Sequence, residues 1–344
     1  MTRMMPVVLA LAGCGDNGLA ARAVDASTSH EQLPIDAPAD ANLMPTDLFD
    51  TGLCVDRACT QIAAGNLEYT PRFPLWADTA TKRRWVHLPE GATIDTSDMN
   101  HWQFPQGFKI WKEFTRDDVR IETRIVAKIG PGDQLSDWFY MAYQWNAAND
   151  DAVAVPLGVK NANGTTQDIP SVADCRACHE KLAPSRVLGF QAIQLDGATP
   201  VGLDEVAQMG WLSAPPSGAS PHFPLPGSQA EKDALGYLHA NCGHCHNPLS
   251  GLTSTPLKMR LDIDHLATTA DTDTYKTAVD VTASLPFMDG GTNYTTIVVT
   301  GNADASALIG RFISTNPNFH MPEIGTKIAD PTALTTLRAW INAL

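Results

Sequence analysis

Apolar and polar side chains alternate along several short segments of the first half of the chain. In RIETRIVAKI (120–129), the Ile, Thr and Ala side chains fall on one face and the charged side chains fall mostly on the other, which is the pattern of an antiparallel strand. The same alternation recurs, between turns rich in Pro and Gly, at residues 83–88, 108–114 and 137–145. We therefore predict a β-sandwich-like or barrel-like module over residues 65–168. Its core and rim are expected to contain Trp85, Trp102, Trp111, Trp138 and Trp145.

The hydrophobic period becomes helical after about residue 228. Ser228 and Glu231 have the spacing of a capping box, and apolar residues follow on one helical face. The last fifteen residues predict a second helix, with Asp330 as cap, Pro331 in the first turn and a stripe of Leu and Ile. We therefore expect a mostly α-helical domain over residues 228–344, and an α+β multidomain chain as a whole.

Residues 1–64 show neither period. MTRMMPVVLALAGC has a basic residue, a short apolar run and small residues before Cys14, which predicts a signal peptide at residues 1–13. Leu11–Cys14 also resembles the lipobox of bacterial lipoproteins, in which the Cys is acylated; an ordinary signal peptide is the alternative. Residues 14–64, rich in Asp, Ala, Pro and Ser, are expected to form a disordered tether. Cys54 and Cys59 could close a small disulfide loop within it.

This beginning predicts export to the bacterial cell envelope, with the protein anchored to the outer membrane or facing the periplasm. The apolar run is shorter than the roughly 20 residues that a spanning helix needs, so the lipid would be the only membrane attachment. A formal charge of −14 argues against nucleic acid as a partner.

Cys-x-x-Cys-His occurs twice, at residues 175–179 and 242–246. A thioredoxin-like dithiol needs a parallel βαβ context, which the sequence before residue 175 lacks. A four-cysteine zinc site would join distant pairs and leave both histidines unexplained. Covalent haem uses every member, because two thiols bond to the vinyl groups and the His binds iron. We therefore predict two haem c groups, attached through Cys175, Cys178, Cys242 and Cys245, with His179 and His246 as axial iron ligands.

The predicted helices around residues 242–246 match the organisation of a cytochrome c domain. Met321-Pro322, just before the last helix, resembles the distal loop of cytochromes c, and Met321 is the expected distal ligand of the second iron. His320 and Met288 are the alternatives for that position. Residues 169–227 would form the first haem-binding segment, whose distal position is either open or filled by one of several side chains. The candidates are His87, His101, His222, His239, Met141 and Met209.

Several stretches together resemble a family of exported bacterial dihaem c-type cytochromes of unassigned role. They include FPLWADTATKRRWVHLPEG, WQFPQGFKIWKEF, VADCRACHE, NCGHCHNP and HMPEIGT, and the resemblance covers about residues 65–344. It implies a β-rich N-terminal module, a haem at the first motif and a C-terminal cytochrome c domain. The 74 residues between His246 and Met321 are more than a minimal cytochrome c has there, because they include a polar insertion rich in Thr and Asp.

Two functions follow from these features. The first is electron transfer by a lipid-anchored dihaem cytochrome, with a redox partner protein or a small electron donor or acceptor. A haem-bearing subunit of a larger dehydrogenase is a variant of it. The alternative is a haem enzyme of the peroxidase type, in which one iron has an open position.

Overall fold

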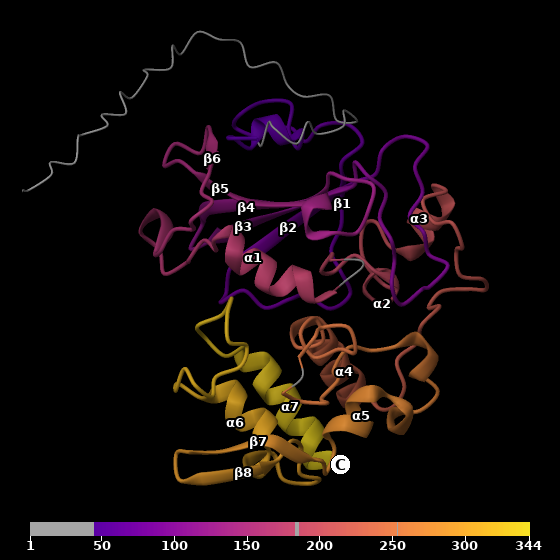
Figure 1. The fold of residues 1–344 in the computed structure, drawn as a ribbon, viewed down its shortest axis with the longest axis vertical. Helices are drawn as coiled ribbons and strands as arrows, with labels where there is room; N and C mark the ends of the chain where they lie inside the picture. Colours follow the sequence, from indigo (N-terminus) through magenta and orange to yellow (C-terminus); the bar gives the residue numbers. More distant parts are fainter. Residues whose placement is uncertain (1–44, 183–185, 253) are drawn as a thin grey trace, which may run out of the picture. The chain divides into compact units, whose positions relative to one another are not determined.

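The computed structural model describes residues 45–182, 186–252 and 254–344, and all of them belong to one compact unit, Gln32–Leu344. Six strands form one antiparallel sheet in which each strand pairs with the next along the chain (Figure 1). The strands are β1 (Leu67–Glu68), β2 (Thr81–His87), β3 (Lys109–Arg116), β4 (Val119–Lys128), β5 (Trp138–Trp145) and β6 (Ala152–Ala154). The four long strands are those that the alternation predicted, and the α+β class is confirmed.

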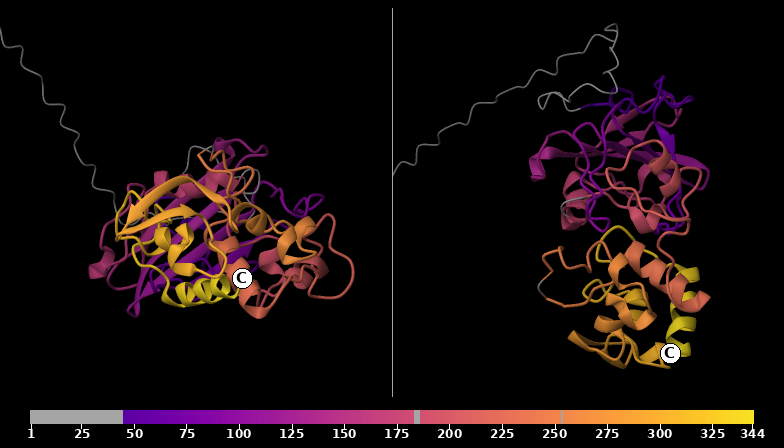
Figure 2. Two further views of the ribbon diagram at one scale, coloured as in Figure 1. Left: turned by 90° about the horizontal axis from the view of Figure 1, so that it is seen from below. Right: turned by 90° about the vertical axis from the view of Figure 1, so that its right-hand side faces the viewer.

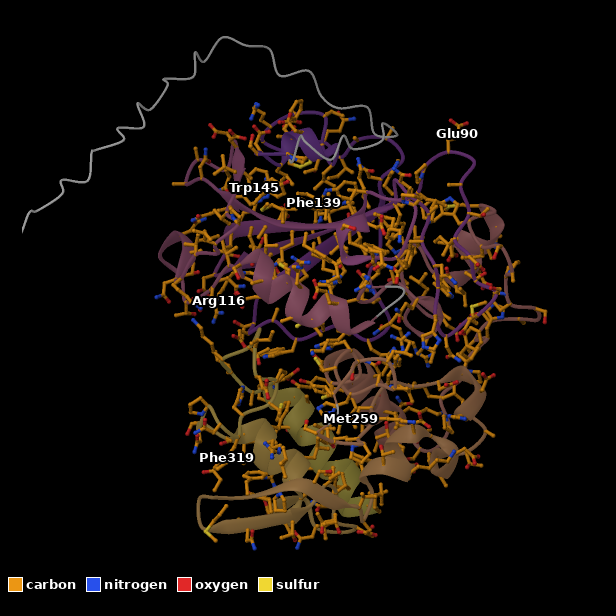
Figure 3. All side chains as sticks on the ribbon, in the orientation of Figure 1. Glu90, Arg116, Phe139, Trp145, Met259 and Phe319 are labelled. Atoms are coloured by element: carbon orange, nitrogen blue, oxygen red, sulfur yellow. A yellow bond between two sulfur atoms is a disulfide. The ribbon has the colours of Figure 1, made fainter. Side chains whose placement is uncertain are left out.

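Both faces of this sheet are buried. On one face, Trp85, Trp111 and Trp145 pack with Leu48 and Leu53 from the segment before β1. Figure 3 shows Trp145 and Phe139 of β5 among the side chains of this core. On the other face, apolar residues of β2, β3 and β4 pack against residues 187–212. All five tryptophans are buried, which confirms their assignment to the core.

The sandwich expectation differs from the structure, because the described residues of this module supply a single sheet. Loops and short helices, rather than a second sheet, cover its faces. Alternation identifies the residues that share a face, but it does not show how strands are divided between sheets. It also does not show whether other segments cover the charged face, on which Glu122 and Arg84 are only 0% and 5% exposed.

The predicted tether is too long. From residue 45 onward the chain packs on the sheet through a short 3-10 helix, η1 (Phe49–Thr51), and Leu53 and Cys54 are fully buried. Cys54 and Cys59 form a disulfide. The composition of this stretch is poor in large apolar residues, but the few that it has are placed in the core of the sheet. Cys14 and the signal peptide lie outside the described residues.

Among the described residues, seven α-helices come after the last strand of the sheet in the sequence. They are α1 (Val172–His179), α2 (Ala192–Leu195), α3 (Leu203–Gln208), α4 (Gln229–Asn241), α5 (Asp273–Ala278), α6 (Ala307–Ile313) and α7 (Pro331–Ala343). The further 3-10 helices are η2 (Leu135–Asp137), η3 (Ala162–Gly164), η4 (Glu180–Leu182), η5 (Ile263–His265), η6 (Thr269–Asp271) and η7 (Ala303–Ala305). None of the described helices is long and apolar enough to cross a bilayer.

The two helices predicted in the last third of the chain are present and pack on each other (Figures 1 and 2). Ser228 caps α4 in a capping box with Glu231, and the Asp330 carboxylate caps α7. Leu238 of α4 and Leu337 of α7 are both 0% exposed in their shared core.

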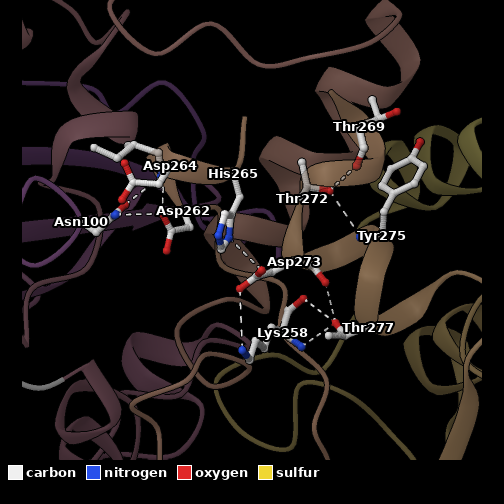
Figure 4. A network of polar contacts seen from close by, with 11 residues as sticks. Asn100, Lys258, Asp262, Asp264, His265, Thr269, Thr272, Asp273, Tyr275 and Thr277 are labelled. Atoms are coloured by element: carbon white, nitrogen blue, oxygen red, sulfur yellow. Dashed lines mark hydrogen bonds and ion pairs between the residues drawn. The ribbon is translucent and has the colours of Figure 1, made fainter. Parts of the chain in front are cut away.

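The polar insertion between these helices is ordered by its own hydrogen bonds and by a small hairpin of β7 (Thr282–Asp289) and β8 (Thr292–Thr296). His265 Nδ1 lies 3.0 Å from a carboxylate oxygen of Asp273 at the start of α5, and Figure 4 shows this contact. In the same network, Asn100 donates to Asp262 at 2.9 Å and so connects the insertion to the loop between β2 and β3. The hairpin was not predicted, because its strands mix polar and apolar residues without strict alternation.

Candidate functional site

The first Cys-x-x-Cys-His motif lies on α1, a helix with a strong start signal. Ser171 Oγ accepts the N–H of Asp174, and the Asp174 carboxylate accepts the N–H of Ser171. Cys175 and Cys178 are three residues apart in this helix, so their thiols point from the same side. Sequence analysis missed this helix, although the Ser-x-x-Asp spacing in SVAD announced it.

His179 at the end of α1 has the protonation and surroundings of a metal ligand. Its Nδ1 is 2.7 Å from the carbonyl oxygen of Arg186. Because a carbonyl only accepts, Nδ1 carries the proton and Nε2 keeps its lone pair. Burial, followed by repulsion from Lys112, lowers the pKa of His179 to about 3, so the ring is neutral. The ring also lies 5.4 Å from that of Tyr140 on β5.

The second motif begins where α4 ends. Cys242 caps the helix, and the N–H groups of Cys245 and His246 both donate to its carbonyl oxygen. Gly243 is required in this turn, because an added Cβ would lie 2.6 Å from the His239 carbonyl oxygen and 2.7 Å from the Arg260 Cα. Burial raises the pKa of the Cys242 thiol to about 12.

His246 carries an orphaned atom beside its cysteines. Its Nδ1 is buried and has no hydrogen-bond partner among the described residues; the Leu257 main chain lies close without hydrogen-bond geometry. Burial is the main cause that lowers the pKa of His246, so this ring is also neutral. Because no hydrogen bond holds a proton on Nδ1, either ring nitrogen of this neutral imidazole can present its lone pair to a metal.

The two motifs meet, although they lie far apart in the sequence. The thiols of Cys178 and Cys245 lie close enough to shift each other's pKa, and this raises the pKa of Cys178 and lowers that of Cys245. The nearby His244 side chain also lowers the pKa of Cys245. Sequence analysis predicted two separate sites and did not anticipate that the second cysteine of each motif would be adjacent.

A cavity of about 400 Å³ opens beside this meeting point, within the range of roughly 300–1,000 Å³ typical of ligand pockets. Its lining includes Cys175, Cys178 and His179 of the first motif and His244 of the second. The face of the sheet and the loop 322–327 complete the wall. Two thiols on one helix face, a neutral imidazole with a free lone pair and this cavity fit the covalent haem predicted for the first motif.

The loop that carries Met321 lies near the second motif. Met321 donates its N–H to the carbonyl oxygen of Arg311, and Pro322 and Glu323 line the cavity. The Glu323 carboxylate is close enough to His246 to affect its pKa. The loop is therefore near the second motif, as a distal ligand requires.

The two alternatives to Met321 have different surroundings. His320 Nδ1 lies 2.9 Å from the Ser314 carbonyl oxygen, which assigns the proton to Nδ1, and its Nε2 is buried without a partner among the described residues. Met288 lies on β7 and is 65% exposed. His320 therefore has a ring nitrogen that is suitable for binding the second iron, whereas Met288 is largely exposed to solvent.

Five of the six side chains considered for the first distal position do not line the cavity; they are His87, His101, His222, Met141 and Met209. His101 and His222 bond to Asp98 and Asp204, and Met209 is 48% exposed. Met141 packs in the core on the opposite face of the sheet, and His87 shares that face by alternation with Trp85.

His239 is the sixth of these candidates and does line the cavity. Its Nδ1 accepts the N–H of Leu261 at 3.0 Å, so the proton of the neutral ring is on Nε2. Burial lowers the pKa of His239 to about 3, which keeps the ring neutral. In this tautomer Nε2 donates and has no lone pair for a metal.

Sequence analysis missed a group of basic side chains on the cavity wall. They are Lys82, Arg84, Lys112 and Arg124, which come from β2, β3 and β4. The alternation placed Arg124 on the face opposite the isoleucines, but it did not show that this face lines a cavity. The described residues contain no cluster of three or more Cys, His, Asp or Glu side chains arranged for a metal ion.

No protein-family model matches the chain, and neither a curated protein nor a solved structure is significantly similar to it.

Proposed function

We propose that the protein is a dihaem c-type cytochrome that transfers electrons in the bacterial cell envelope. The observation that carries this proposal is the meeting of the two Cys-x-x-Cys-His motifs, with Cys178 and Cys245 near enough to shift each other's pKa and Cys178 on the wall of a cavity. Two haems attached at adjacent motifs would be close to each other, which favours electron transfer between them. When bound, each haem supplies a reversible one-electron change at its iron.

The chain's own groups have separate roles in this proposal. Cys175, Cys178, Cys242 and Cys245 provide the thiols for covalent attachment. His179 and His246 provide axial nitrogens, and the Arg186 carbonyl orients the His179 ring through its Nδ1–H. Burial of both imidazoles keeps them neutral and therefore able to bind iron.

The finer features extend the proposal. Residues 228–344 would be a cytochrome c-like domain in which α4 and α7 pack beside the second haem, with Met321 as its distal ligand. Acylation of Cys14 would anchor the protein, and a redox partner protein or a small molecule would exchange electrons with it. Membership of the exported dihaem cytochrome family belongs to the same proposal, and its support is the set of sequence motifs.

The tautomer of His239 favours a second candidate, a haem enzyme of the peroxidase type. None of the six side chains considered offers a nitrogen lone pair or a sulfur to the cavity beside the first motif. Lys112 lines the same cavity, and burial lowers its pKa to about 7, a value suited to proton transfer. An open iron at the first site, revealed by binding of cyanide or carbon monoxide, would favour this candidate over electron transfer.

The deciding experiment is the mass of the mature protein made together with cytochrome c maturation machinery. We expect two covalently bound haems, and one in each of the variants Cys175→Ala and Cys242→Ala. The matched control is the double variant Cys54→Ser/Cys59→Ser, which removes two cysteines outside the motifs and should keep two haems. A correctly processed protein with the mass of the apoprotein, or one that contains stoichiometric zinc, would refute the proposal.

A further inference from the structure

Cations of three neighbouring strands lie opposite one another on the cavity wall. The strand register pairs Arg84 of β2 with Lys112 of β3, and Lys112 with Arg124 of β4. All three side chains line the cavity. Like charges directly opposite each other across a sheet are destabilising, so this arrangement needs a compensating negative charge.

The protein supplies only part of that charge. Glu122 is 0% exposed and holds Arg124 through two hydrogen bonds of 2.6 and 2.8 Å. Lys112 donates to the Leu188 carbonyl oxygen at 3.0 Å, which is a neutral partner. Arg84 is 5% exposed and forms no ion pair with any residue in the described ranges. Two of the three cations therefore lack a counter-charge.

The carboxylates that line the same cavity are engaged elsewhere. Asp78 accepts main-chain N–H groups from the loop after Met321, and Asp174 caps α1. Asp168 pairs with Lys160 and Lys327. The Glu323 carboxylate is close enough to His246 of the second motif and to Arg311 to oppose the lowering of their pKa values by burial. None of them is paired with Arg84 or Lys112 in the described part of the chain.

The electrostatic effect of this imbalance is large. Burial, followed by repulsion from Arg84 and Arg124, lowers the pKa of Lys112 to about 7. Burial also lowers the pKa of Arg84. A buried anion that accepts hydrogen bonds from these groups would favour their charged forms and so oppose both shifts.

We propose that Arg84, Lys112 and Arg124, the basic wall of the cavity, bind the propionate carboxylates of the haem attached to Cys175 and Cys178. The inference rests on the proposed function and adds the residues that neutralise the first haem. Haem carries two propionates besides its vinyl groups, and among the described residues three cations of this wall, Lys82, Arg84 and Lys112, form no ion pair with a carboxylate. The thiols of Cys175 and Cys178 and the cations of the wall line one cavity.

The test is a redox titration of the matured holoprotein and of the double variant Arg84→Met/Lys112→Met. We expect two haems to remain attached, because no thiol is changed. One of the two midpoint potentials should fall, because cations stabilise the reduced, less positive haem. A fall of about tenfold in the equilibrium constant for reduction corresponds to about 59 mV for one electron.

Two kinds of control separate charge from packing. The charge-conserving variants Arg84→Lys and Lys112→Arg should keep the potential close to that of the wild type. Arg83→Met removes a cation from the same strand on its other face, where Arg83 is 56% exposed and pairs with Glu68, and should change neither potential. If the double variant does not fold, Lys112→Met alone should give a smaller fall at the same haem.

The outcomes distinguish this inference from the function on which it depends. A protein without covalent haem would refute the proposed function itself. Two attached haems with unchanged potentials in Lys112→Met and in the double variant would overturn the inference alone. A wild-type potential that shifts on addition of succinate, in a manner lost in the variants, would assign the wall to a free carboxylate and would also overturn it.

Discussion

The two Cys-x-x-Cys-His motifs have the same spacing but different surroundings. Between the cysteines of the first motif, Arg176 and Ala177 are exposed on α1. Between those of the second, Gly243 and His244 are buried in a tight turn after α4. The first motif faces charged side chains of the sheet, whereas Cys242 packs against the apolar core of α4 and α7.

This comparison shows what a short motif specifies and what it leaves to the fold. The motif supplies two thiols and an imidazole at both positions, so it predicts the same attachment chemistry twice. The residues around each motif differ in charge and polarity, and these properties would set the potential of an attached haem. In the proposed function, the first haem would be tuned mainly by the basic wall and the second by apolar packing and by the Met321 loop.

The largest expected effect tests the apolar frame of the second motif. Leu238→Ala should lower the free energy of unfolding by about 2–5 kcal/mol, because the side chain is 0% exposed and packs in the core shared with α7. Urea unfolding of the holoprotein measures this change. Leu157→Ala is the control, since Leu157 is 91% exposed, and its effect should stay within about 0.5 kcal/mol. Equal effects of the two variants would contradict the assigned core.

The elements around this core were predictable from the sequence, for physical reasons. The capping boxes and apolar stripes of α4 and α7 are local signals, and both helices were found where predicted. The strands β2 to β5 also follow from local alternation. The meeting of Cys178 with Cys245 depends on how distant segments pack, and no local pattern contains that information.

The burial of charged side chains was not predicted. Arg84, Lys112 and Arg124 alternate with apolar residues, and this pattern does not show whether other segments cover their face. Their burial results from the segments that close over the sheet, which include α1 and the loop 322–327. The length of the tether was overestimated for a related reason. The stretch before residue 65 has few large apolar side chains, but two of them, Leu48 and Leu53, are buried in the core of the sheet.

The second prediction concerns the distal ligand of the second haem. Met321→Ala should lower one midpoint potential by roughly a hundredfold in the reduction equilibrium, or about 120 mV, because thioether ligation favours the reduced iron. The sulfur-to-iron absorption band should disappear while both haems stay attached. Met288→Ala is the control, since this methionine is 65% exposed.

His320 provides the competing outcome. If Met321→Ala leaves both potentials and the absorption band unchanged, and His320→Ala alters one potential, the ligand is the imidazole. The buried, unpaired Nε2 of His320 is the structural reason for including that variant.

The third prediction compares the residues between the cysteines. Gly243→Ala should destabilise the protein by about 1–3 kcal/mol, because the added Cβ would lie 2.6 Å from the His239 carbonyl oxygen. Ala177→Ser adds one heavy atom at an exposed position of the first motif and should change stability by less than about 0.5 kcal/mol. Thermal unfolding of both holoproteins measures the difference, and similar values would show that the two turns are equally permissive.

The smallest expected effect concerns His222, which lies between α3 and α4. His222 Nε2 is 2.8 Å from the Asp204 carboxylate, and this hydrogen bond raises the pKa of His222 above its usual 6.5. The charged pair therefore stabilises the fold fully below the unfolded pKa, and the stabilisation is lost as pH rises through the folded pKa. His222→Gln should cost up to about 1 kcal/mol at pH 5.5 and much less at pH 8.5, because Asp204 is partly exposed. Urea unfolding at the two pH values measures this, and the haem spectrum should not change. A spectral change at the first haem would instead make His222 its ligand and would require the segment to move, since His222 does not line the cavity.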